Sequence, residues 1–70
     1  QNLQDGESYF NEANALYKQK KYDEAIKEYQ KARFNNDISS AKNYANMGNA
    51  YVKKAKMADL KKAVKSYEKS

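Results

Sequence analysis

Few side chains in this chain of 70 residues could carry out acid–base, nucleophilic or metal chemistry. It contains no Cys and no His, so the commonest thiolate and imidazole ligands and general bases are missing. The closest acidic residues, Asp23, Glu24 and Glu28, are interspersed with Lys27 and Lys31, which is typical of a charged helix surface with local ion pairs. Paired catalytic carboxylates need a partly dry pocket that separates their pKa values, and no such pocket is indicated. We therefore expect no enzyme activity, no metal site and no cofactor.

A second group of side chains could bind a ligand without catalysing a reaction. It consists of Phe10, Asn14, Tyr17 and Lys18 in the first half of the chain and of Lys42, Asn46, Asn49 and Lys53 in the second. The last four follow the i, i+4, i+7, i+11 spacing of one helix face. Asn donates and accepts hydrogen bonds and can pair with a peptide backbone, an exposed Phe or Tyr can anchor an apolar side chain, and Lys favours acidic ligands.

Four helices are predicted to position these side chains. Apolar residues at helical spacing place the first two at about residues 7–20 and 23–34. The expected N-caps are Asp5 for the first helix, Ser39 or Ser40 for the third and Asp59 for the fourth, and Asn35-Asn36-Asp37 is the expected break after the second. Connections this short make neighbouring helices antiparallel.

Small residues stand in the apolar faces of all four predicted helices. Ala13, Ala25, Gly48 and Ala63 occupy these positions. Gly inside a helix costs about 1 kcal/mol relative to Ala, and this cost is understandable if another helix crosses closely there. The seven Tyr residues are expected to fill the space between layers and to keep their hydroxyl groups at the rim, in water.

Two stretches of the chain share one pattern. The second half contains Tyr44-x2-Met47-Gly48-x2-Tyr51 followed by Ala63-x3-Tyr67, and the first half contains Tyr9-x2-Glu12-Ala13-x2-Leu16 followed by Ala25-x3-Tyr29 and Ala32. The first parts are offset by 35 residues, as from Tyr9 to Tyr44, and the second parts by 38, as from Ala25 to Ala63. The pattern resembles that of the tetratricopeptide repeat, W-x2-L-G-x2-Y…A-x3-F, over about residues 6–70.

The resemblance implies an all-α fold, a right-handed helical solenoid of two antiparallel helix-turn-helix repeats with four helices in all. Residues 1–70 would form a single tetratricopeptide repeat domain, with repeat 1 at about 6–39 and repeat 2 at about 40–70. Family members bind segments of other proteins in a concave groove lined by the first helix of each repeat, so the resemblance implies that the eight residues of the second group line a peptide-binding groove. Changing Asn14 and Asn49 to Ala is expected to abolish binding and to leave the fold intact.

The chain departs from the family pattern at four places. Glu12 stands where Leu is usual, and Asp37 where the terminal Pro is usual. Repeat 2 has three extra residues within Lys54–Asp59, which are expected to lengthen the third helix by about 4.5 Å. The fourth helix ends early, so we expect that the parent protein continues or that the last helix self-associates.

Three further interpretations stay open. The lysines of the second half could form a basic face that binds nucleic acid or an anionic surface; they are Lys53, Lys54, Lys56, Lys61, Lys62, Lys65 and Lys69. The interpretation that we prefer for these lysines is a solvated face that maintains solubility. A carboxylate clamp, which some co-chaperone members use, matches at Asn14 and Asn46 but has Phe10 at its first basic position. The chain could also be a structural end of a longer array.

Charge and composition limit the partners further. Residues 1–38 carry a net charge of −1, from six basic and seven acidic side chains, and residues 39–70 carry +6, from eight Lys against Asp59 and Glu68. This asymmetry favours an acidic partner for the second half. The resemblance implies that the partner is a protein or peptide. Nucleic acid is not expected, because the chain has one Arg and no nucleic-acid-binding motif. No apolar run approaches the roughly 18 residues that span a bilayer. The cytoplasm is the expected compartment.

Overall fold

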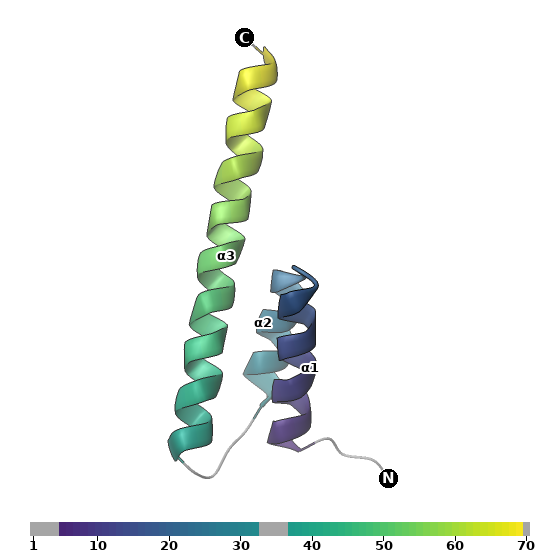
Figure 1. The fold of residues 1–70 in the computed structure, drawn as a ribbon, viewed down its shortest axis with the longest axis vertical. Coiled ribbons are helices and arrows are strands. Elements are labelled where there is room, and N and C mark those ends of the chain that lie inside the picture. The colour runs from purple at the N-terminus through teal and green to yellow at the C-terminus, as the bar shows by residue number, and fades with distance from the viewer. Residues whose placement is uncertain (1–4, 33–36, 70) are drawn as a thin grey trace.

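A computed structural model of the chain describes residues 5–32 and 37–69. Three helices make up this part: α1 (Gly6–Lys18), α2 (Tyr22–Lys31) and α3 (Asp37–Lys69). Helices α1 and α2 form an antiparallel hairpin, and α3 packs along this hairpin and then extends beyond it (Figure 1). All regular secondary structure in the described residues is thus helical. None of their helices is both long enough and apolar enough to cross a membrane.

Helix α1 begins and ends with well-formed caps. The Asp5 carboxylate accepts a hydrogen bond of 2.8 Å from the backbone N–H of Ser8, which confirms the predicted N-cap and lowers the pKa of Asp5. At the other end, the N–H groups of Lys20 and Lys21 donate to the carbonyls of Tyr17 and Leu16, each at 2.9 Å. This pair of bonds is a Schellman motif. It holds Lys20 at a φ of 66°, the left-handed region that favours Gly.

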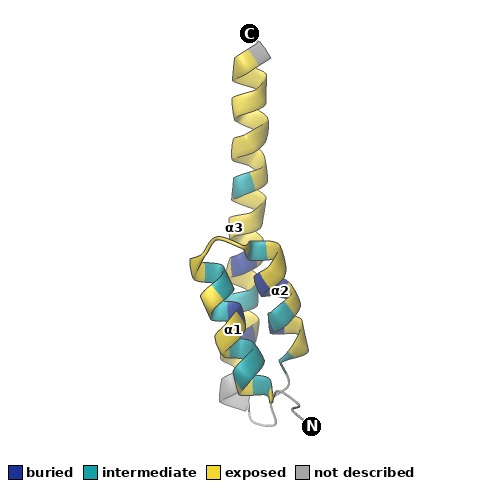
Figure 2. Cartoon of the chain, turned by 90° about the vertical axis from the view of Figure 1, so that its right-hand side faces the viewer, coloured by how far each residue is buried: buried dark blue, intermediate teal, exposed yellow. Residues whose placement is uncertain are grey.

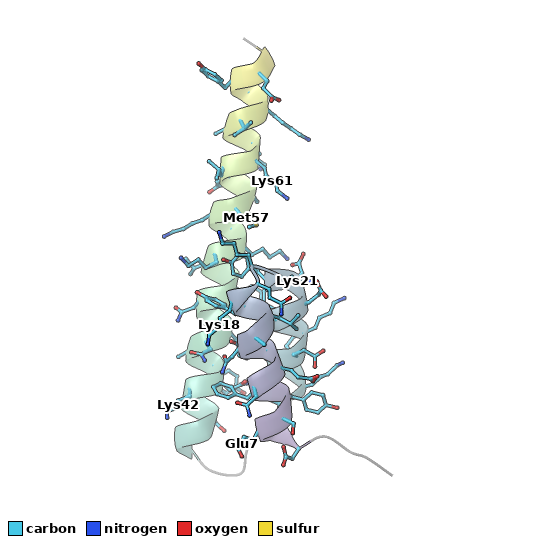
Figure 3. All side chains as sticks on the ribbon, turned by 45° about the vertical axis from the view of Figure 1, so that its right-hand side comes forward. Glu7, Lys18, Lys21, Lys42, Met57 and Lys61 are labelled. Carbon is cyan, nitrogen blue, oxygen red and sulfur yellow. The ribbon has the colours of Figure 1, made fainter. Side chains whose placement is uncertain are left out.

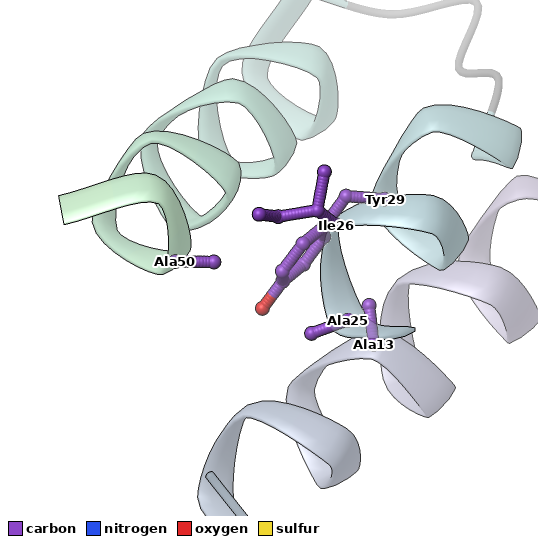
Figure 4. Close-up of a cluster of buried hydrophobic side chains, with 5 residues drawn as sticks. All are labelled: Ala13, Ala25, Ile26, Tyr29 and Ala50. Carbon is purple, nitrogen blue, oxygen red and sulfur yellow. The ribbon is translucent and has the colours of Figure 1, made fainter. Parts of the chain in front are cut away.

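The core lies between α1, α2 and the first part of α3. Its buried residues are Ala13, Ala25, Ile26, Tyr29 and Ala50 (Figure 4). Ala13 and Ala25 are both fully buried, which confirms that small residues mark the crossing of the first two helices. The Asn43 side chain of α3 is also buried, and its amide Nδ2 donates to the backbone carbonyl of Tyr29 at 3.0 Å. The same carbonyl, in the last turn of α2, also accepts from the backbone N–H of Ala32 at 3.2 Å.

The prediction of four helices is wrong for the described residues. The expected third and fourth helices are one continuous helix of 33 residues, and Asp59 lies inside it rather than at a cap. A helix of this length spans about 50 Å at 1.5 Å per residue, in keeping with a longest molecular dimension of 54 Å. Residues 35 and 36 of the expected break lie outside the described residues, while Asp37 is the first residue of α3.

Two packing expectations also need correction. A Cβ atom added at Gly48 would meet nothing within 4 Å, so no helix crosses closely there. Tyr29 is only 1% exposed, so its hydroxyl is not at a rim. The half of α3 beyond the hairpin is almost entirely exposed (Figure 2), because the hairpin is too short to cover it.

Candidate binding groove

An open cavity of about 340 Å³ lies where α1 and α3 meet above α2. Its lining residues come from all three helices: Asn14, Tyr17, Lys18, Tyr29, Asn46 and Asn49. The residues of α1 and of α3 recur at three- or four-residue spacing, so each helix presents one face to the cavity. We call this cavity the Asn groove.

Tyr29 forms the floor of the Asn groove. Its ring is buried in the core, and its hydroxyl donates a hydrogen bond to Oδ1 of Asn14. Burial raises the pKa of Tyr29, and the neighbouring Tyr17 phenol raises it further, although hydrogen bonding with Asn46 works in the opposite direction. The phenol is therefore neutral at physiological pH and acts as a donor.

A polar network joins the three helices at this floor. Oδ1 of Asn14 accepts a second hydrogen bond, of 3.0 Å, from Nδ2 of Asn46. The hydrogen bonds among the described residues thus use the carbonyl oxygen of Asn14 and the amide nitrogen of Asn46. They leave Asn14 Nδ2 as a donor and Asn46 Oδ1 as an acceptor for a ligand.

Aromatic rings support the wall and the back of the Asn groove. The Tyr17 ring packs edge-on against Tyr22, with centroids 5.4 Å apart and an interplanar angle of 72°. Phe10 lies behind the floor, with its ring centroid 6.1 Å from that of Tyr29, and it packs against the core. Such aromatic pairs fix ring orientation, so the shape of the groove exists before any ligand arrives.

The structure brings together five of the eight predicted binding residues. Asn14, Tyr17, Lys18, Asn46 and Asn49 line the groove. Phe10 does not, since it supports the core. Lys42 and Lys53 are exposed on α3 but are not among the lining residues; Figure 3 shows Lys42 near the N-terminal end of α3, far from Met57 and Lys61.

Tyr29 is the lining residue that the sequence reasoning missed. Its spacing with Ala25 and Ile26 assigned it to the core face of its helix, which is correct for the ring. A buried phenol, however, requires a hydrogen-bond partner. Asn14, which is polar and close to the apolar stripe of the neighbouring helix, was the available signal.

A second cavity, of about 310 Å³, lies beside the turn between α1 and α2. It is lined by Lys20, Lys21, Tyr22, Asp23, Glu24, Lys54, Met57, Ala58 and Lys61. Asp23 and Lys54 form an ion pair of 2.7 Å across its mouth, and their hydrogen bond lowers the pKa of Asp23 and raises that of Lys54. Both side chains are more than half exposed, so the pair orients α3 on α2 with little effect on stability.

Two lysines of the second half, Lys54 and Lys61, line this second cavity. Lys54 is paired with Asp23, and the described side chains of the cluster are exposed along α3; the side chain of Lys69 lies outside the described part. Glu28 pairs with Lys31 at 3.4 Å, as predicted for a charged helix surface. Within residues 5–32 and 37–69, no three acidic side chains gather as a metal site would require.

Comparison with known proteins agrees with the hairpin. Residues 6–34 match the sequence model of the tetratricopeptide repeat, and this match spans α1, the Schellman turn and α2. No curated protein and no solved structure gave a match. Residues 6–34, which are 29 of the 70 residues, are therefore similar in sequence to one tetratricopeptide repeat.

Proposed function

We propose that the Asn groove binds an extended peptide segment of a protein partner. The family is one of protein–protein interaction modules, which supports this class of function. The observation that carries the proposal is the pair of amide groups on the groove floor. Asn14 Nδ2 and Asn46 Oδ1 offer one donor and one acceptor, and a peptide unit offers the complementary carbonyl and N–H.

The internal hydrogen bonds support this role because they fix both amides in advance. Tyr29 and Asn46 both donate to the same oxygen of Asn14, so the orientation of the Asn14 amide is determined by the fold. A preformed site loses little side-chain entropy when it binds. Lys18 at the edge adds a positive charge that favours an acidic segment, and Tyr17 offers an apolar wall. With so small a groove, we expect an affinity of about micromolar or weaker.

Asn14 also accepts the hydrogen bond of the buried Tyr29 hydroxyl. The combined change of Asn14 and Asn49 to Ala is therefore a poor test of binding. Removal of Asn14 would also leave the buried Tyr29 hydroxyl without its acceptor. Asn49 lines the groove and is exposed, and its change to Ala alters the groove alone. Asn11 is an exposed residue of α1 that does not line the groove. Asn11→Ala removes the same amide from a helix surface and is the matched control.

The test is binding of a labelled acidic pentapeptide of alternating Glu and Leu with a free carboxylate. Amide NMR shifts should map to Asn14, Tyr17, Asn46 and Asn49, and Asn49→Ala should weaken binding about five- to tenfold, equivalent to one hydrogen bond. Asn11→Ala should bind like the parent chain. A short single-stranded oligonucleotide serves as competitor. Equal affinity of the two Ala variants, or shifts confined to the lysines from Lys53 to Lys65, would contradict the groove assignment.

A further inference from the structure

The large apolar side chains that the structure leaves exposed all belong to α3. They are Tyr44, Tyr51, Val52, Leu60, Val64 and Tyr67, with exposures from 47% to 81%. With roughly 250 Å² for a fully exposed Tyr and less for Leu or Val, they present on the order of 800 Å² of surface. At 100° per residue they are spread over more than half of the circumference of α3, so a partner on one side covers only part of this area, compared with the roughly 800 Å² that each partner buries in a stable interface.

The crossing of α1 and α2 in the hairpin indicates how α3 could pack against another helix. Ala13 of α1 and Ala25 of α2 lie together at 0% exposure (Figure 4), and the small side chains let the two helices approach closely. In the second occurrence of the sequence pattern, the corresponding residues are Gly48, 35 residues after Ala13, and Ala63, 38 residues after Ala25. The chain therefore carries the residues for a second crossing of this kind.

That second crossing is not made within one chain. A Cβ at Gly48 would meet nothing within 4 Å, and Ala63 is exposed. Both residues lie on the continuous α3, where about fifteen residues at 1.5 Å each separate them by about 22 Å along the axis. A straight helix cannot bring its own residues 48 and 63 into contact.

The two positions nevertheless lie on the same side of α3, away from the hairpin. About fifteen residues correspond to about four turns and a further 60°, so Ala63 stands roughly above Gly48. The buried Ala50, which faces α2, is two residues from Gly48 and therefore about 200° around the helix. A helix that packs over Gly48 and Ala63 would not meet α1 or α2.

We propose that this side of α3 binds a second copy of the same chain, with the two α3 helices antiparallel. Gly48 of each copy then crosses Ala63 of the other, and the two-fold axis passes near Ala55. The same register places Tyr44 level with Tyr67 of the second copy. Tyr51, whose hydroxyl accepts a hydrogen bond of 3.4 Å from Nε2 of Gln30 in α2, lies at the edge of this side. Such an interface is self-complementary and closes with two copies.

The distribution of charge supports the antiparallel order. The second half of α3, residues 53–69, carries seven lysines against Asp59 and Glu68, whereas the first half, residues 37–52, carries only Asp37 and Lys42. An antiparallel pair places the lysine-rich half of each α3 beside the half of the other α3 that has no net charge. A parallel pair would place the two lysine-rich halves side by side, where like charges repel.

Disulfide trapping tests the proposal, because the chain has no Cys of its own. Gly48→Cys and Ala63→Cys are both at exposed positions, so each variant should fold. Mixing the two variants under oxidising conditions should give a covalent dimer, since a disulfide needs Cα atoms about 4.4–6.8 Å apart. Each variant alone should stay uncross-linked, because residues 48 of the two copies lie far apart. Absence of the mixed dimer would overturn the proposal.

Two further measurements separate the alternatives. A chain with both Cys residues should also give covalent dimers; an internally cross-linked monomer would show that the chain closes on itself and would overturn the proposal. Without Cys, sedimentation over a range of concentrations should show a dimer, and Ala63→Arg should raise its dissociation constant at least about tenfold. Ala58→Arg, an exposed site beside the hairpin, should leave the dissociation constant unchanged. Equal dissociation constants for the two Arg variants would also contradict the interface.

Discussion

The hydrogen bond between Tyr29 and Asn14 provides the strictest test of how the structure is held together. In Asn14→Ala, the Tyr29 hydroxyl, buried with its ring, loses the acceptor that α1 provides. A buried donor left without a partner costs about 1–3 kcal/mol. Asn46, which is only partly buried, also loses an acceptor, and this adds a smaller amount. We expect a loss of about 2 kcal/mol, a large part of the roughly 3–6 kcal/mol that a chain of this size has available.

Tyr29→Phe allows this loss to be assigned to the bond itself. Phe keeps the buried ring and removes the hydroxyl, while Asn14 still accepts from Asn46, so we expect a cost of only about 0.5–1.5 kcal/mol. Without the Tyr29 hydroxyl, Asn14→Ala no longer leaves a buried donor without an acceptor. Its cost in the Tyr29→Phe background should therefore fall by about 1 kcal/mol or more.

The assay is urea denaturation followed by far-UV circular dichroism on the four chains of this cycle. A chain of this size has an m-value of about 1 kcal/mol per molar urea, so the expected differences correspond to shifts of about 1–2 M in the midpoint. Asn11→Ala, at an exposed Asn of the same helix, is again the control and should change stability by less than about 0.5 kcal/mol. An equal cost of Asn14→Ala in both backgrounds would refute the reasoning.

Four further predictions concern the two ends of α1, the buried phenol and α3. Lys20→Gly should raise the free energy of unfolding by about 1 kcal/mol, because Gly adopts the positive φ of Lys20 without strain; an unchanged urea midpoint would contradict this, and Lys21→Gly is the control. The pKa of Asp5 is lowered in the folded chain, so its stabilising effect should be present above pH 3.8 and disappear as the pH falls through the folded pKa. Conversely, the raised pKa of Tyr29 means that stability should fall as the pH rises above 10, and Tyr29→Phe should reduce this alkaline loss, as urea midpoints measured against pH would show. Replacement of Met57-Ala58 by Asn-Gly should weaken α3 at its middle and lower the yield of the mixed disulfide dimer, whereas the same replacement at Lys65-Ser66 should not.

Much of the hairpin could be predicted from the sequence because its signals are local. Each of these signals involves residues within one or two helical turns of each other. They are the Asp5 cap three residues before Ser8, the apolar spacing of α1, and the small residues at positions 13 and 25. Most of the Asn groove was also predictable, because Asn14 and Asn46 lie on helix faces whose spacing is visible in the chain. The position of Tyr29 was not, because whether a phenol ends in water or on a partner depends on how α3 packs across the hairpin.

The continuity of α3 shows what a repeat pattern leaves undetermined. Gly48 and Ala63 indicate that two helices should cross there, since only small residues allow that approach. They do not determine which chain supplies each helix; that depends on the segment between them. In the hairpin this segment holds the Schellman turn, with Lys20 in a left-handed conformation. Between Gly48 and Ala63 there is no Gly or Pro, and residues 53–58 are Lys, Ala and Met, which are among the best helix formers. Local preference therefore keeps α3 straight, and a crossing between two copies satisfies both the pattern and the helix.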